Sequence, residues 1–277
     1  MIEVTGLTKR YGEIRAVDNV SFKIERGTVF GLLGPNGAGK TTTIKILTTL
    51  SKPDSGQCLI EDFDVVVDSI AVKKLIGIVP QENNLDRELT AYENLVIYSL
   101  LYRVPNRAAK IQQYLQFVDL WNRRDSLVST FSGGMQRRLL IARALLSEPS
   151  VLFLDEPSIG LDPQIRRQMS DIIRKTRMEG RTVVITTHYI EEAEALCDRI
   201  GILEKGRLIA LDTPSNLKAN VGDYIVEFVN DQGKLIQRIC KDREEAHSIA
   251  HCKECSVTIR KSNLEDVFIK LTGERIE

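Results

Sequence analysis

The stretch Gly34-Pro35-Asn36-Gly37-Ala38-Gly39-Lys40-Thr41-Thr42 decides the fold of this chain, because it has the pattern G-x-x-x-x-G-K-T. An apolar run at residues 29–33 precedes it, and a helical pattern over residues 39–50 follows it. Glycines let a backbone wrap around an anion with its N–H groups turned inward, and the helix adds its positive end. In such a loop Lys40 reaches the β- and γ-phosphates, and the Thr41 hydroxyl ligates Mg²⁺. The sequence therefore predicts a phosphate-binding loop in which all nine residues border nucleotide phosphates. The alternative is an ordinary glycine-rich turn between a strand and a helix.

Acidic and basic residues balance at 38 each over 277 residues, and the pI is near 6.9. This balance gives no general attraction to nucleic acid or to an anionic membrane, so no nucleic-acid partner is expected. No stretch approaches the roughly 18 apolar residues of a membrane span. The N-terminal residues enter a strand pattern at once and lack the layout of a signal peptide. We therefore expect a soluble, cytoplasmic protein.

The five cysteines are scattered along the chain, which does not indicate a disulfide framework. Cys252 and Cys255 have a C-x-x-C spacing that could suit zinc. A second such pair is absent from the sequence, and His251 next to Cys252 is an awkward ligand. Packing or surface thiols are therefore favoured over a metal site.

The order of strand and helix patterns predicts an α/β fold. Residues 1–33 alternate in the manner of antiparallel strands, and helical periodicity dominates residues 89–147. The apolar strand at 151–154 is typical of the middle of a parallel sheet, and strands and helices alternate beyond it as in a doubly wound sheet. We predict a P-loop NTPase core over residues 1–215, with an antiparallel β subdomain and a helical insert.

The pattern restarts after residue 215. Three strand-like segments and two helix-like segments follow: residues 223–229, 234–240 and 255–260, and residues 242–250 and 263–271. They predict a small C-terminal α+β domain over residues 222–277. Its sequence carries no chemistry that points to a ligand.

Two carboxylates, Asp155 and Glu156, end the apolar strand at 151–154. Carboxylates at the C-terminal edge of a parallel sheet, beside a phosphate loop, are costly unless they have a function. Asp155 can hold Mg²⁺ through water, and Glu156 can orient or deprotonate an attacking water. The alternative is a pair of helix-capping carboxylates.

A second anion site is predicted at Ser132, Gly133 and Gly134, which open the helical segment after residue 133. A hydroxyl and two glycines at a helix N-terminus can bind a phosphate. Alone, this pattern would be an ordinary serine-capped helix more often than not.

Together these motifs resemble the nucleotide-binding subunit of an ATP-binding-cassette (ABC) transporter over about residues 1–215. The phosphate loop matches the family's Walker A loop, residues 131–135 its signature, and residues 151–156 its Walker B strand and catalytic carboxylate. The resemblance also implies the roles of four shorter elements: Tyr11 stacks on adenine, Gln81 of the Q-loop contacts Mg²⁺ and the permease, Asp162 belongs to the D-loop at the nucleotide, and His188 touches the γ-phosphate. By the same resemblance Lys40, Gln81, Glu156 and His188 take part in catalysis, and Thr41, Gln81 and Asp155 hold the metal.

The signature departs from the family's usual L-S-G-G-Q at Phe131 and Met135, while the three residues expected to contact phosphate are intact. Such variants resemble the branch of the family that exports drugs, antibiotics and lipids. Residues 263–269 also resemble the C-terminal domain found in that branch.

The resemblance implies a head-to-tail homodimer with two ATP molecules between the chains. Ser132, Gly133 and Gly134 of one chain would face the phosphate loop of the other, and being in the helical insert they need not face their own. An integral membrane permease would be the second partner, docked on the Q-loop and on residues 90–119. The protein would then sit peripherally on the inner face of the cell membrane.

The sequence thus predicts an ATPase subunit, dependent on ATP and Mg²⁺, that powers a membrane exporter of drugs, antibiotics or lipids. The alternative is a soluble ABC ATPase that acts on ribosomes or DNA. Proteins of that class usually carry tandem cassettes, long coiled coils, zinc modules or basic tails, and this sequence has a single cassette and no net charge. An importer subunit is disfavoured by the signature variant and the C-terminal segment. A degenerate, non-hydrolysing regulator is disfavoured because every catalytic position is filled.

Overall fold

The computed structural model describes residues 1–219, 221–229, 232–251 and 256–272. Cys252 and Cys255, for which a metal site was weighed, lie outside these residues. None of the helices in the described part of the chain combines the length and apolar character that a transmembrane span requires.

A six-stranded sheet forms the centre of the large domain, in the order β10-β9-β3-β8-β7-β6. The strands are β3 (Val29–Leu33), β6 (Ile76–Val79), β7 (Val151–Asp155), β8 (Thr182–Thr187), β9 (Arg199–Glu204) and β10 (Arg207–Asp212). All pairings are parallel except that of β10 with β9. Every residue of β3, β7 and β8 is buried, because both faces of the sheet are covered.

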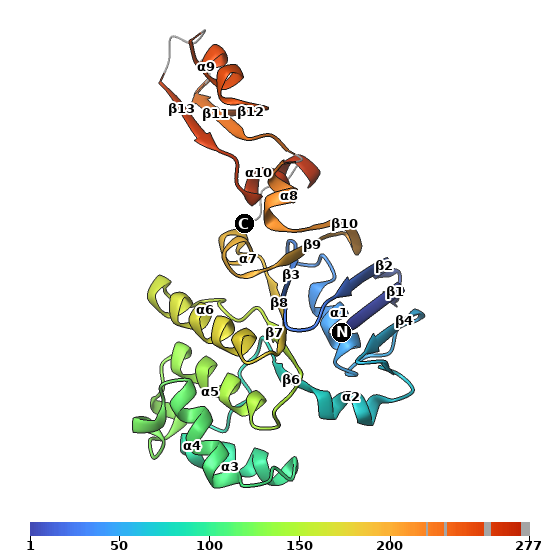
Figure 1. Ribbon diagram of the computed structural model, residues 1–277, viewed down its shortest axis with the longest axis vertical. Helices are drawn as coiled ribbons and strands as arrows, with labels where there is room; N and C mark the ends of the chain where they lie inside the picture. The colour runs from blue at the N-terminus through green and yellow to red at the C-terminus, as the bar shows by residue number, and fades with distance from the viewer. Residues whose placement is uncertain (220, 230–231, 252–255, 273–277) are drawn as a thin grey trace.

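An antiparallel sheet, in the order β2-β1-β4-β5, lies beside the central one (Figure 1). Its strands are β1 (Ile2–Tyr11), β2 (Ile14–Ile24), β4 (Ser55–Ile60) and β5 (Phe63–Asp64). Alternate residues of β1, such as Ile2 and Val4, are buried in one cluster with Ile44 and Ile46 of helix α1 (Lys40–Leu47). The phosphate-loop helix is therefore held by both sheets.

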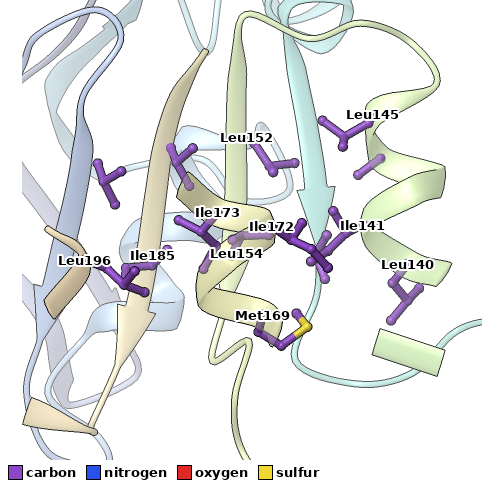
Figure 2. Packing of buried hydrophobic residues seen from close by; sticks show 14 of the residues in the cluster. Leu140, Ile141, Leu145, Leu152, Leu154, Met169, Ile172, Ile173, Ile185 and Leu196 are labelled. Atoms are coloured by element: carbon purple, nitrogen blue, oxygen red, sulfur yellow. The ribbon is translucent and has the colours of Figure 1, made fainter. Parts of the chain in front are cut away.

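Helix α2 (Ser69–Leu75) lies on the same side as α1, since its Val72 is buried in the same cluster. The next helices cover the opposite face of the central sheet and form the predicted insert. They are α3 (Ala91–Leu101), α4 (Arg107–Phe117), α5 (Gly133–Leu145), α6 (Pro163–Met178), α7 (Ile190–Leu196) and α8 (Pro214–Ala219), with 3₁₀ turns at Trp121–Arg123 and Val128–Thr130. A capping box between Thr90 and Glu93 starts α3. Figure 2 shows how Ile141 of α5 and Ile172 of α6 pack beside Leu154 of β7, so the insert shares its core with the sheet.

The C-terminal segment forms a three-stranded antiparallel sheet in the order β12-β11-β13, which projects from the large domain (Figure 1). Its elements are β11 (Tyr224–Val229), β12 (Leu235–Cys240), α9 (Arg243–His251) and β13 (Val257–Lys261). A small cluster of Val226, Phe228, Cys240 and Ala246 joins α9 to the sheet.

The last helix, α10 (Leu264–Thr272), returns to the large domain and packs on α7 and α8. Its apolar residues Leu264, Val267 and Phe268 are buried in the main core, at the spacing of one helix face. The Arg260 guanidinium, paired with Asp266, links β13 to this helix. Helix α10 is thus part of the large domain's core, although it follows the small sheet in sequence; the division at residue 222 itself stays a prediction.

Candidate active site

The phosphate loop connects β3 to α1, and its glycines are needed for two close approaches. A Cβ at Gly34 would lie 2.4 Å from the carbonyl oxygen of Leu203, and one at Gly39 2.3 Å from that of Ala16. Gly37 and Gly39 also have φ angles of +81° and +102°, which favour glycine. The loop is therefore pressed against β9 and β2, with no space for larger residues at its two ends.

Lys40 is the central cation of the site and is only 5% exposed. Its Nζ donates to the carbonyl oxygens of Gly34 (2.6 Å) and Pro35 (3.2 Å), and it lies 3.2 Å from Glu156 Oε1. A buried ammonium group must be compensated in this way. The same three donor positions can serve phosphate oxygens.

The predicted metal ligands Thr41 and Asp155 lie side by side. Thr41 Oγ1 donates to Asp155 Oδ1 at 3.3 Å, across the gap between α1 and β7. Thr186 of β8 donates to the same oxygen at 2.5 Å. Sequence reasoning missed Thr186; the available signal was a hydroxyl residue near the C-terminal end of the strand paired with β7.

Glu156 lies between the Lys40 ammonium group and the His188 ring. Its side chain is buried, with the residue only 5% exposed. Its Oε2 is 2.7 Å from Nδ1 of His188, and its Oε1 faces the Lys40 ammonium. The backbone of Glu156 has φ +49°, a region that non-glycine residues adopt only when the surroundings enforce it. Its N–H donates to Thr186 Oγ1 at 2.9 Å. The structure thus brings Lys40, Glu156 and His188 together.

A cavity of about 510 Å³ opens over the phosphate loop. This volume is in the range of small-molecule sites, about 300–1,000 Å³. Its lining includes Gln81, Glu156 and seven of the nine predicted loop residues: Pro35, Asn36, Gly37, Gly39, Lys40, Thr41 and Thr42. Ile14, Arg15, Ala16 and Lys205 line it too, and sequence reasoning missed them because no motif marks them.

Seven of the residues predicted to bind nucleotide lie outside that lining, and so do the predicted metal ligand Asp155 and the predicted catalytic residue His188. Two of the seven, Gly34 and Ala38, belong to the phosphate loop. Tyr11, at the end of β1, is 49% exposed. Asp162 caps α6 by accepting a hydrogen bond from the N–H of Ile165 at 2.9 Å. The other three form the start of α5: Ser132, which caps the helix by accepting from the N–H of Met135, Gly133 and Gly134. Their contacts with nucleotide stay predictions.

Behind the catalytic pair lies Glu192 of α7, a buried carboxylate that the sequence did not indicate. Its Oε2 accepts from Thr187 Oγ1 at 2.8 Å, and its Oε1 accepts from Ser158 Oγ. It therefore joins the segment after Glu156 to the segment before His188. Burial raises the pKa of Glu192, and the two hydroxyl hydrogen bonds oppose the rise.

We expect Glu192→Gln to gain thermal stability relative to the unmodified chain as the pH rises. Because the pKa of Glu192 is higher in the folded chain, its contribution to stability is complete below the ordinary value of 4.5 and is lost as the pH rises through the raised pKa. Glutamine does not titrate. Melting temperatures at pH 5 and pH 8 check this, with exposed Glu191→Gln as the control. A stability difference that shrinks with rising pH would contradict the burial argument.

A strand–loop–helix phosphate site whose lysine and threonine face two strand-end carboxylates defines a P-loop ATPase. The model of the ABC transporter family matches residues 17–159, and the chain belongs to this family. It is 38% identical to the Nod factor export ATP-binding protein I of Burkholderia orbicola, over 100% of this chain and 98% of that protein. It is also 38% identical to the daunorubicin resistance ATP-binding protein DrrA3 of Streptomyces coeruleorubidus, over 99% and 96%.

Solved structures agree with this fold. The ATP-binding cassette MJ0796, in a dimeric post-hydrolysis state with ADP and Pi, is 30% identical with a TM-score of 0.69, over 77% of this chain and 98% of that one. The cbiO1 protein of Clostridium perfringens, part of a transporter complex, is 28% identical with a TM-score of 0.73, over 79% and 90%. The predicted fold class, the ABC resemblance with its export branch, ATP binding and ATPase activity are confirmed.

Proposed function

We propose that this chain is the ATP-hydrolysing subunit of a membrane exporter and acts on the inner face of the membrane through a separate permease. The relatives that carry export or resistance names support this, because they align over nearly their whole length, the C-terminal segment included. The same names favour a drug, antibiotic or lipid as cargo over an imported solute.

We further propose that Thr41, Asp155 and Gln81 hold Mg²⁺. Hydroxyl, carboxylate and amide oxygens are the ligands that Mg²⁺ prefers, and the 3.3 Å hydrogen bond between Thr41 and Asp155 supports a shared position for them. Gln81 borders the same cavity. When bound, Mg²⁺ would neutralise charge on the β- and γ-phosphates.

The residues of the cavity suit hydrolysis by an in-line water. Glu156 would accept a proton from the attacking water. The oxygen of that water would bond to the γ-phosphorus while the bond between the γ-phosphorus and the β–γ bridging oxygen breaks. His188, 2.7 Å from the Glu156 carboxylate, would fix its orientation. Lys40 would exchange the Glu156 carboxylate for phosphate oxygens and stabilise their charge.

A head-to-tail homodimer is supported by one observation in particular: Ser132, Gly133 and Gly134 lie outside the lining of their own chain's cavity. The N-terminus of the 13-residue helix α5 offers free N–H groups to an anion. A second copy would bring these groups to the phosphates. ATP would then favour the closed dimer, and hydrolysis would release it.

Exposed apolar side chains on α3 support a permease contact there. Leu101 is 75% exposed, and Ile97, Leu100 and Tyr102 are about half exposed. Large apolar side chains gathered on one exposed helix are typical of an interaction site. The helix follows the segment that carries Gln81, so a permease bound to it could sense the nucleotide cavity.

The test is an affinity purification of tagged Glu156→Gln from detergent-solubilised membranes with ATP and Mg²⁺, followed by mass spectrometry. We expect a polytopic membrane protein in stoichiometric amount, and we expect Leu101→Glu to lose it while still binding ATP. Ribosomal or DNA-repair proteins in place of a membrane protein would overturn the exporter and favour the soluble ATPase.

A further inference from the structure

Arg137, on the first turns of α5, is a buried guanidinium that bonds only to backbone carbonyls among the contacts of the described residues. It is 7% exposed, and burial lowers its pKa to about 10, so it stays charged at neutral pH. Its acceptors are Pro157 O (from Nε, 3.1 Å), Pro80 O and Gln81 O (from Nη1, the latter 3.4 Å), and Asp155 O and Glu156 O (from Nη2, 2.5 and 2.9 Å).

These five carbonyls belong to two segments that both end at the nucleotide cavity. One segment follows β6 and carries Gln81; the other runs from Asp155, the last residue of β7, and carries Glu156. A guanidinium offers five N–H donors in a rigid plane, so one side chain can hold both segments at fixed positions. A lysine offers a point charge with no fixed plane and cannot reproduce this pattern.

Two more side chains of α5 bind the segment after Gln81. Asn83 Nδ2 donates to Gln136 Oε1, and the Arg143 guanidinium donates to Asn84 Oδ1 at 2.5 Å and to Asn84 O at 3.3 Å. Helix α5 is therefore bonded along its length to the Q-loop segment. A shift of α5 must move that segment with it.

Glu156 depends on external support of the same kind. Its φ of +49° is a strained conformation for a residue with a Cβ, and such strain persists only where neighbours enforce it. Thr186 holds its N–H, and Arg137 holds its carbonyl. Loss of the guanidinium would remove the support of the Glu156 carbonyl. The carboxylate of Glu156 would then lose its fixed orientation.

We propose that Arg137 is a positioning residue that couples the two ATP sites of the dimer. The inference rests on the proposed head-to-tail arrangement, in which Ser132–Gly134 contact the ATP of the partner. Arg137 lies about one turn further along the same helix. ATP bound at the partner's site therefore fixes the position of α5. Through its hydrogen bonds, Arg137 then fixes the positions of Gln81 and Glu156 in its own chain's site. The predicted consequence is positive cooperativity in ATP hydrolysis.

The experiment measures ATPase rate against ATP concentration for full-length Arg137→Gln. We expect kcat to fall at least about tenfold, equivalent to about 1.4 kcal/mol. The Hill coefficient should fall from a value near the two-site limit of about 2 toward 1. ATP affinity, measured by fluorescent-nucleotide displacement in a Glu156→Gln background, should change less than about twofold, because Arg137 is outside the cavity lining.

Arg138→Gln is the matched control. Its guanidinium donates to Val118 O and Asp119 O within the helical insert, and it contacts neither catalytic segment. Its kcat and Hill coefficient should stay near those of the unmodified chain. If Arg137→Gln does not fold, Arg137→Lys decides the question, since it keeps the buried charge but should still lose cooperativity.

Two failures can be told apart. If Glu156→Gln forms no ATP-dependent dimer, the proposed function is wrong. If that dimer forms and folded Arg137→Gln or Arg137→Lys hydrolyses ATP with unchanged kcat and Hill coefficient, the coupling role of Arg137 is overturned and the dimer stands.

Discussion

Replacement of Glu156 by glutamine is expected to lower kcat for ATP hydrolysis at least about a hundredfold while ATP binding is kept. The side chains have the same shape, so the packing beside His188 and Lys40 survives. An amide, however, cannot take a proton from water. The loss of the negative charge next to Lys40 also leaves that ammonium group freer to bind phosphate. Binding should therefore be equal to, or tighter than, that of the unmodified chain.

Three measurements check this expectation: phosphate release at saturating ATP, fluorescent-nucleotide affinity, and the molar mass in solution with ATP. Glu156→Gln should convert to a dimer with ATP and Mg²⁺ and stay dimeric, because the ligand that holds it closed is not consumed. Glu191→Gln, an exposed carboxamide substitution on α7, is the control and should turn over normally. Turnover of Glu156→Gln near that of the control would remove Glu156 as the base.

The central part of the site could be predicted because it is local in sequence. The phosphate loop, the strand before it and the helix after it occupy one short stretch, and the glycine spacing is imposed by backbone geometry. Asp155 and Glu156 were predictable for a related reason. A fully apolar strand must lie inside a parallel sheet, and its carboxyl end must meet the same edge as the phosphate loop.

The supporting residues could not be predicted, because their partners are distant in sequence and are mostly backbone atoms. Arg137 donates to carbonyls of residues 18 to 57 positions away in the sequence. Every residue has a backbone carbonyl, so no pattern of side chains shows which carbonyl will accept a hydrogen bond. Glu192 is one of several glutamates on α7, and only the fold buries it between Ser158 and Thr187. Ile14 and Arg15 reach the cavity because β2 passes over the loop.

Helix α10 shows the same limit at the level of domains. Its sequence continues from the small C-terminal sheet, and chain order alone groups the two. The apolar face of Leu264, Val267 and Phe268 has no matching surface on that small sheet, whose own core is filled by α9. The face is buried instead against α7 and α8, which precede it by more than forty residues.

Lys40→Ala is expected to weaken ATP binding about 10- to 100-fold, the value of one charge-assisted hydrogen bond of about 1.5–3 kcal/mol. It should also destabilise the nucleotide-free chain by about 3 kcal/mol, because it leaves the buried Glu156 carboxylate without its cation. Fluorescent-nucleotide titration and chemical unfolding measure the two effects. Lys45→Ala, an exposed change on the same helix, should alter stability by no more than about 0.5 kcal/mol.

The double variant Lys40→Ala with Glu156→Gln separates these effects. Removal of the Glu156 charge takes away the unpaired carboxylate, so most of the lost stability should return, while ATP binding should stay weak because the phosphates still lack Lys40. The non-additive part of the stability change is then the coupling between the two side chains. Unchanged ATP affinity in Lys40→Ala would contradict the phosphate-loop assignment. Strict additivity of the stability changes would contradict the pairing of Lys40 with Glu156, which lie 3.2 Å apart.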